Sequence, residues 1–151
     1  MILINILTNM LIRTFIILLV EDNPADVRLV EEAFKESEIN TELNVVNDGV
    51  EAMEFLKHGK NYENAPIPDL ILLDLNLPRK DGREILKEIK NDNDLKHIPV
   101  VILTTSSSEE DIYETYAHHA NSYIVKPANV GLFIETMKNL EDYWFRMLKL
   151  P

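Results

Sequence analysis

The chain has 151 residues, of which 46% are hydrophobic and 27% charged, and it contains no cysteine. This length corresponds to one domain, since domains usually contain roughly 100–200 residues. The 26 Asp and Glu residues outnumber the 15 Lys and Arg residues, which gives a formal net charge of −11. Such a charge argues against a nucleic-acid-binding module, because that class needs a basic face. The absence of cysteine excludes disulfides, thiolate zinc sites and cysteine nucleophiles, and it is compatible with a cytoplasmic protein.

The first 20 residues are unusually apolar, with 15 apolar side chains among them. A signal peptide or a membrane span can have this composition. Neither is favoured, because no basic residues precede the stretch and no small-residue cleavage site follows it. Its second half is instead typical of a buried strand that runs into an acidic loop at Glu21 and Asp22. We therefore expect no membrane association from this segment.

The same boundary suggests how the chain is organised. We expect an apolar extension over residues 1–13, in which Met10 is an alternative start, and one domain over residues 14–148. About ten residues remain after the expected core, so no output domain is expected to follow it.

Beyond residue 14, apolar runs of strand length alternate with segments of helical periodicity. The predicted strands cover residues 15–20, 41–46, 69–74, 100–103 and 122–125. The predicted helices cover residues 24–37, 50–58, 83–91, 107–120 and 129–148. Capping signals support two of the helix starts, in the segments Asp22-Asn23-Pro24 and Asn47-Asp48-Gly49. Five such strand–helix units predict an α/β fold, a parallel sheet with helices on both faces.

Polar side chains follow four of these strands, at the edge where α/β folds bind ligands. Glu21 and Asp22 follow the first strand, Asp74 ends the third, and Thr104 and Lys126 follow the fourth and fifth. Three carboxylates in one place repel each other, and a divalent cation relieves that repulsion. A ligand set made only of oxygens favours Mg²⁺ over zinc. The sequence therefore predicts a magnesium site beside a lysine and a threonine.

These residues lie in segments that resemble the receiver domain of two-component response regulators. Thr104 lies 30 and Lys126 lies 52 positions after Asp74, which is similar to the spacing in that family. The resemblance extends over about residues 15–140 and rests on five segments in order: residues 18–23, 69–78, 81–82, 99–104 and 123–127. It implies a flavodoxin-like, doubly wound, five-stranded parallel sheet of order 2-1-3-4-5, with helices on both faces.

The resemblance also implies a role for each residue of the site. Asp74 would be the phosphoacceptor that attacks a phosphohistidine on a sensor histidine kinase. Glu21 and Asp22 would hold Mg²⁺ together with Asp74 and the backbone carbonyl of Asn76. Lys126 would pair with a phosphoryl oxygen. These roles suit phosphoryl transfer, which depends on positioning and charge neutralisation.

A switch is implied as well. On phosphorylation the hydroxyl of Thr104 would bond a phosphoryl oxygen, and Tyr123 would swing into the vacated space. The face formed by the fourth helix, fifth strand and fifth helix, residues 107–120, 122–125 and 129–148, would then change. We expect a homodimer through this face. The aromatic run Tyr143-Trp144-Phe145 belongs to an apolar helical stripe, and such a stripe is usually core. It extends past what one five-stranded domain needs to cover, however, which also favours an interface.

Within the family, the sequence is similar to small receivers that partner bacterial phytochromes. The resembling features are the long loop over residues 58–68, the stretch of residues 73–82 and the aromatic C-terminal run. The expected partner is therefore a sensor histidine kinase of phytochrome type or a phosphotransfer protein. The chain is not expected to be a metabolic enzyme, although it would catalyse its own phosphorylation and dephosphorylation.

Two alternatives remain open. The first is a Mg²⁺-dependent phosphatase with an aspartate nucleophile, although that class usually has a second Asp where this chain has Asn76. The second is a scaffold that acts without phosphorylation.

Overall fold

A computed structural model of the chain describes residues 2–4, which are helical, and residues 13–147. The expected extension over residues 1–13 lies mostly outside the described residues. Within the described ranges, no helix has both the length and the apolar character needed to cross a bilayer.

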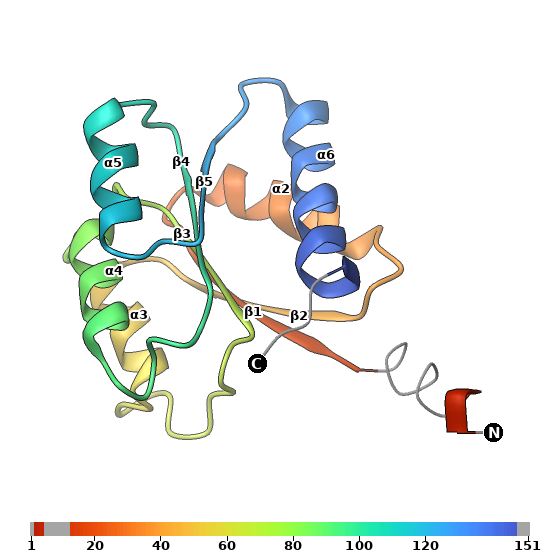
Figure 1. Cartoon of the computed structure of the whole chain (residues 1–151), viewed down its shortest axis with the longest axis horizontal. Helices are drawn as coiled ribbons and strands as arrows, with labels where there is room; N and C mark the ends of the chain where they lie inside the picture. The colour runs from red at the N-terminus through yellow and green to blue at the C-terminus, as the bar shows by residue number, and fades with distance from the viewer. Residues whose placement is uncertain (1, 5–12, 148–151) are drawn as a thin grey trace.

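Five parallel strands form one sheet in the order β2-β1-β3-β4-β5, as predicted (Figure 1). The strands are β1 (Phe15–Val20), β2 (Thr41–Val46), β3 (Leu70–Leu73), β4 (Val100–Thr104) and β5 (Ser122–Val125). Because β1 and β3 lie inside the sheet, helices cover both of their faces. Leu18 and Val20 belong to one core cluster, whereas Ile17 and Leu19 belong to the other. This alternation explains why the strand is a continuous apolar run.

The helices form one layer on each side of the sheet (Figure 1). One layer contains α2 (Pro24–Lys35) and α6 (Val130–Glu141), which pack against each other. The opposite layer contains α3 (Gly49–Leu56), α4 (Gly82–Asn91) and α5 (Glu109–Ala117). The flavodoxin-like, doubly wound α/β fold is therefore confirmed.

Side-chain caps fix where the helices begin. The Asn23 side chain accepts a hydrogen bond from the backbone N–H of Ala25 at 2.9 Å, and Asp48 accepts one from Glu51 at 2.8 Å. These bonds satisfy backbone donors that have no partner within the helix. Both caps lie in segments where the sequence predicts a helix start, and they set the first turns of α2 and α3 beside the carboxyl ends of the strands.

The C-terminal helix differs from its prediction over residues 129–148. Helix α6 ends at Glu141, and a π-helical segment, η1 (Asp142–Met147), follows. Trp144 and Phe145 are buried, and the Phe145 ring stacks on Phe15 at 4.4 Å between centroids. The expectation that the aromatic run favours an interface is therefore wrong for these two residues, because they pack into the domain's own core. Tyr143 is half exposed.

The loop after β3 passes very close to the strand at Gly82. A Cβ atom there would lie 2.1 Å from the carbonyl oxygen of Asp74 and 2.7 Å from the Cα of Leu75. The Gly82 N–H donates to the carbonyl of Leu75 at 3.0 Å. Only a glycine therefore allows the start of α4 to approach the end of β3 in this way.

Glu141 is a buried acid at the end of α6, with 1% of its surface exposed. Among the described residues, neither carboxylate oxygen has a partner in hydrogen-bonding geometry. Burial raises its pKa to about 7, although the nearby hydroxyls of Ser37 and Thr41 oppose that shift. A carboxylate at this position is therefore costly to the fold when it is charged.

Replacing Gly82 by alanine should lower the free energy of unfolding by about 1–3 kcal/mol, because the new methyl group overlaps backbone atoms. Chemical denaturation measures this difference. Gly59→Ala is the control, because its Cβ would make ordinary contacts at 3.5 Å, and it should shift stability by less than about 0.5 kcal/mol. Equal stabilities for the two variants would contradict the close approach at Gly82.

Glu141→Gln should change how stability depends on pH. A carboxyl group with a raised pKa stabilises the fold below its ordinary pKa of 4.5, and this contribution is lost as the pH rises through about 7. The stability of the variant relative to wild type should therefore rise by roughly 1–3 kcal/mol between about pH 5 and pH 8. Denaturation at several pH values measures it, with the exposed Glu135→Gln on the same helix as control. Parallel profiles for wild type and Glu141→Gln would contradict the prediction.

Candidate functional site

The site lies at the edge of the sheet where β1, β3, β4 and β5 end, toward the top of Figure 1. Glu21 and Asp22 follow β1, and Asp74 follows β3. Thr104 is the last residue of β4, and Lys126 follows β5. The parallel sheet thus brings together residues that are up to 105 positions apart in the chain.

Three acids form a compact cluster at this edge. One oxygen from each of Glu21, Asp22 and Asp74 lies within 4.8 Å of the other two. Glu21 and Asp74 are buried, whereas Asp22 is exposed. Burial raises the pKa of Glu21 to about 7, and the charge of Asp74 adds to this effect, while Lys126 opposes it. The three acids therefore form an oxygen-rich cluster that is exposed to solvent at Asp22.

The ammonium group of Lys126 lies against this cluster. Its Nζ donates to Oδ2 of Asp74 at 3.1 Å, to Oδ2 of Asp26 at 2.9 Å, and to Oε1 of Glu21. Only 5% of the lysine side chain is exposed. Burial lowers the pKa of Lys126, but the hydrogen bonds to Glu21 and Asp26 outweigh it and raise the pKa above its usual value. Lys126 is therefore a fixed positive charge at the phosphoacceptor candidate.

Asp26 is a residue that the sequence reasoning missed. It lies in the first turn of α2, where an acid is usually explained by the helix dipole alone. Its place in the first turn of the helix that directly follows Glu21 and Asp22 is the signal that could have placed it at the same edge.

The loop after β3 folds over the carboxylate of Asp74. The backbone N–H of Asn76 donates to Oδ1 of Asp74 at 3.2 Å. Together with Lys126 on Oδ2, this bond fixes the orientation of the carboxylate. Asn76 thus lies beside Asp74, next to the acidic cluster.

The predicted switch residues are connected through the loop after β4. Thr104 is fully buried, and its Oγ1 accepts a long hydrogen bond of 3.5 Å from the backbone N–H of Ser106. The hydroxyl of Tyr123 donates to the carbonyl of Ser106 at 2.8 Å. Tyr123 is half buried and packs against the core, and this burial raises its pKa. Thr104 and Tyr123 are therefore both hydrogen-bonded to the backbone of this loop at Ser106.

A second connection, not predicted from the sequence, holds the same loop. Ser106 Oγ donates to Asp111 at 2.7 Å, and Arg83 forms two hydrogen bonds of 2.7 Å with the same carboxylate. Arg83 also pairs with Asp81, the cap of α4. These bonds join α4, α5 and the loop after β4.

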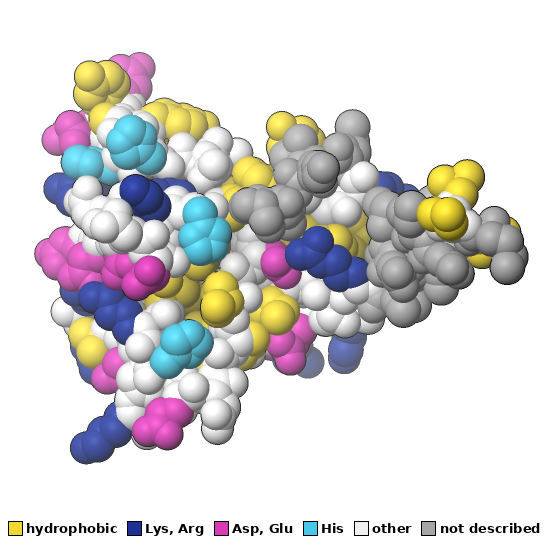
Figure 2. Space-filling model, turned by 60° about the horizontal axis from the view of Figure 1, so that its bottom comes forward, with side chains coloured by type: hydrophobic (Ala, Val, Ile, Leu, Met, Phe, Trp, Pro, Cys, Tyr) yellow, Lys and Arg dark blue, Asp and Glu magenta, His cyan; other side chains and the backbone are white. Residues whose placement is uncertain are grey.

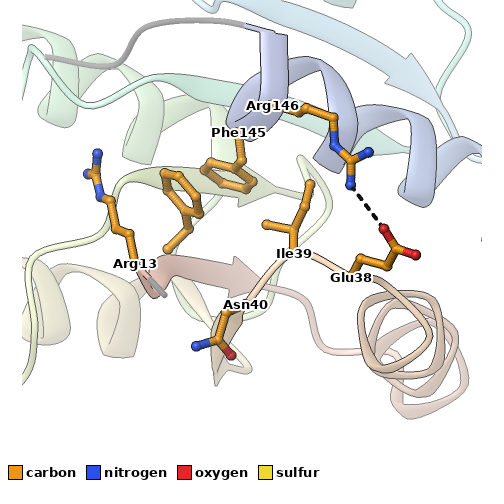
Figure 3. A pocket seen from close by; sticks show the side chains of 7 residues that line it. Arg13, Glu38, Ile39, Asn40, Phe145 and Arg146 are labelled. Atoms are coloured by element: carbon orange, nitrogen blue, oxygen red, sulfur yellow. Dashed lines mark ion pairs between the residues drawn. The ribbon is translucent and has the colours of Figure 1, made fainter. Parts of the chain in front are cut away.

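A separate hollow lies at the opposite edge of the sheet. Figure 3 shows its lining, which includes Arg13, Glu38, Phe145 and Arg146 around a cavity of about 310 Å³. Arg146 pairs with Glu38 at 3.9 Å, and Arg13 pairs with Asp69 at 3.1 Å. In Figure 2, which turns the bottom of the molecule forward, Lys and Arg side chains lie among acidic ones. Within the described part of the chain, the hollow therefore lacks the buried acids that define the site above.

Comparisons with known proteins agree with this arrangement. The sequence model of the response regulator receiver domain matches residues 17–138. Response regulator Rcp1 from Synechocystis sp. is 51% identical over 136 residues, which cover 90% of this chain and 92% of Rcp1.

Two solved structures show the same fold. The Mn²⁺-bound form of response regulator Rcp1 has a TM-score of 0.88 at 50% identity, covering 91% of this chain and 99% of its own. The phosphorylated cyanobacterial phytochrome response regulator RcpA has a TM-score of 0.90 at 50% identity, covering 92% and 99%. The protein belongs to the response regulator receiver domain family, and it is therefore a phosphoryl-accepting domain of two-component signalling rather than a metabolic enzyme.

Proposed function

We propose that Asp74 is the phosphoacceptor, and that a phosphohistidine on a sensor histidine kinase or a phosphotransfer protein is the donor. The observation that carries this proposal is the orientation of the Asp74 carboxylate between Lys126 and the N–H of Asn76. An oxygen of Asp74 forms the new bond to phosphorus, and the bond from phosphorus to the histidine nitrogen breaks. That nitrogen keeps the electron pair and takes up a proton, while Lys126 neutralises a phosphoryl oxygen.

Glu21, Asp22 and Asp74, with the backbone carbonyl of Asn76, would hold Mg²⁺. The support is the donor chemistry: the three carboxylate oxygens lie within 4.8 Å of one another, and an oxygen-only set suits this ion. When bound, the ion supplies charge neutralisation for the phosphoryl oxygens. The related response regulator Rcp1 has a Mn²⁺-bound form, which is consistent with a divalent site in such proteins. The same residues would let the protein catalyse its own phosphorylation and dephosphorylation.

Thr104 and Tyr123 would transmit the change. The Thr104 hydroxyl would bond a phosphoryl oxygen, which would pull on the loop that Ser106 and Tyr123 share. Since Asp111 and Arg83 hold the same loop, its movement would reach α4 and α5. The output would be a changed surface over α5, β5 and α6.

The partner would be a histidine kinase of phytochrome type. The support is the similarity to Rcp1 and to RcpA, a cyanobacterial phytochrome response regulator. Such a kinase would place the protein in the cytoplasm, with residues 14–148 as the receiver domain.

A homodimer through α5, β5 and α6 is part of this proposal. The face exposes Tyr113, Tyr116 and Val125, of which Tyr113 is 73% exposed. Strand β5 is also an edge of the sheet, with pairing capacity on one side. These features favour contact with a second copy.

Phosphorylation can be tested by intact-mass spectrometry after incubation with Mg²⁺ and acetyl phosphate. Wild type should gain the mass of one phosphoryl group, and the gain should disappear with Asp74→Asn or with EDTA in place of Mg²⁺. Asp22→Asn should show no gain at the Mg²⁺ concentration that suffices for wild type, because it lacks one metal ligand.

The exposed Glu32→Gln on α2 is the matched control and should behave like wild type. A phosphoryl gain in folded Asp74→Asn would show that another residue is the acceptor. No gain in folded wild type with either acetyl phosphate or a phosphorylated histidine kinase would favour the scaffold alternative.

The dimer can be tested by sedimentation equilibrium at micromolar concentration. Wild type should show twice the 17.5 kDa mass of one chain. Tyr113→Glu should be monomeric, because it places a charge in the proposed interface, whereas Ile67→Glu, exposed elsewhere, should remain dimeric. A single-chain mass for wild type would refute the dimer.

A further inference from the structure

Asp26 is a fourth carboxylate at the site, but it is not part of the metal-binding candidate. The described acids whose oxygens lie within 4.8 Å of one another are Glu21, Asp22 and Asp74, and Asp26 is not among them. Asp26 instead contacts Lys126, with 2.9 Å between Oδ2 and Nζ. This bond joins the start of α2 to the loop after β5, and it is shorter than the 3.1 Å bond from Lys126 to Asp74.

The start of α2 holds Asp26 in place. The Asn23 side chain accepts from the backbone N–H of Ala25 at 2.9 Å and of Asp26 at 3.4 Å. Pro24 fixes the backbone at the first helical position. The Asp26 side chain is only 20% exposed, so solvent screens its bond to Lys126 only in part. The carboxylate is thus a preorganised acceptor on a rigid element.

An ammonium group has three N–H donors, and three carboxylates accept from Lys126. Two of these acceptors, Glu21 and Asp74, also belong to the acidic cluster that would face a divalent cation. Such a cation would attract both carboxylates and would repel the lysine, because the two positive charges are close. Asp26 is the acceptor outside that cluster, so the cation would not draw its carboxylate away from the hydrogen bond to Lys126.

We propose that Asp26 is a positioning residue. By accepting one N–H of the Lys126 ammonium group, it holds the lysine so that another N–H of this group points to the phosphoacceptor Asp74. The proposal rests on the proposed function, in which Lys126 pairs with a phosphoryl oxygen. Asp26 itself touches neither the phosphoryl group nor the metal, and it acts through the lysine.

The first test measures the lysine directly and does not depend on phosphorylation. NMR of protein labelled with ¹⁵N-lysine gives the hydrogen-exchange rate of the Lys126 ammonium protons, with Lys126→Ala identifying the signal. In Asp26→Ala the exchange should be about tenfold faster, because one charge-assisted hydrogen bond is lost. Asp26→Glu should restore slow exchange, since it keeps a carboxylate on the same helical turn.

Glu32→Ala is the matched control, because it removes one negative charge from an exposed position of the same helix. Its exchange rate should equal that of wild type. Unchanged exchange in folded Asp26→Ala would overturn the proposal, as would an equal acceleration in Glu32→Ala. A backbone NMR spectrum shows that each variant is folded, and Asp26→Asn replaces Asp26→Ala if the latter is not.

The second test is the rate of phosphorylation by acetyl phosphate with Mg²⁺. Asp26→Ala should be phosphorylated about 3- to 10-fold more slowly than wild type, with Asp26→Glu largely restored. In the Lys126→Ala background the same change at Asp26 should have no further effect, because both residues act as one unit. A full additional loss in that background would show that Asp26 does not act through Lys126. If wild type is not phosphorylated at all, the proposed function fails, and the ammonium exchange still decides the role of Asp26.

Discussion

The contact between one ammonium group and three carboxylates is the interaction on which the site depends. Glu21 and Asp74 are buried beside each other, and two carboxylates so close together disfavour each other's charged form. Lys126 supplies the opposite charge, and the hydrogen bonds from its Nζ also satisfy oxygens that solvent reaches poorly. The cost of taking these charges out of water offsets much of their attraction, so the contact is weak evidence for stability. One lysine does not balance all of these acids, and the excess negative charge would favour a divalent cation at this cluster.

The sheet explains how these charges come to one place. Strands β1 and β3 are covered on both faces, so their side chains are apolar until the strand ends. The first polar side chain after each strand then lies at the same edge, because parallel strands end together. Tight loops complete the arrangement: Gly82 lets the start of α4 approach the end of β3, and the N–H of Asn76 reaches back to Asp74. The loop between β3 and α4 therefore affects both the packing of the domain and the geometry of the site.

The region that would carry the signal is built differently. Hydrogen bonds between a loop and the starts of two helices hold it together, in addition to the packing of Tyr123 against the core. Ser106 is at its centre, since its carbonyl accepts from Tyr123 and its hydroxyl donates to Asp111. Asp111 in turn accepts two bonds from Arg83 on α4, and the guanidinium lowers the pKa of this carboxyl.

The sequence by itself determined the strands, most helix starts and the residues of the acidic cluster. Those features are local: a continuous apolar run marks a buried strand, Asn23 and Asp48 mark helix starts, and the acids follow the strands directly. The meeting of the strand-end residues was also predictable, because parallel strands end at one edge, but only the tertiary structure decided the contacts outside that pattern. Two contacts join segments that no local pattern connects: the bond of Lys126 to Asp26 and the pairing of Arg83 with Asp111. The burial of Glu141 likewise depends on the packing of the whole domain. The burial of Trp144 and Phe145 was also decided by the tertiary structure. An apolar stripe on a helix suits a core or an interface, and only the surface that packs against it distinguishes the two.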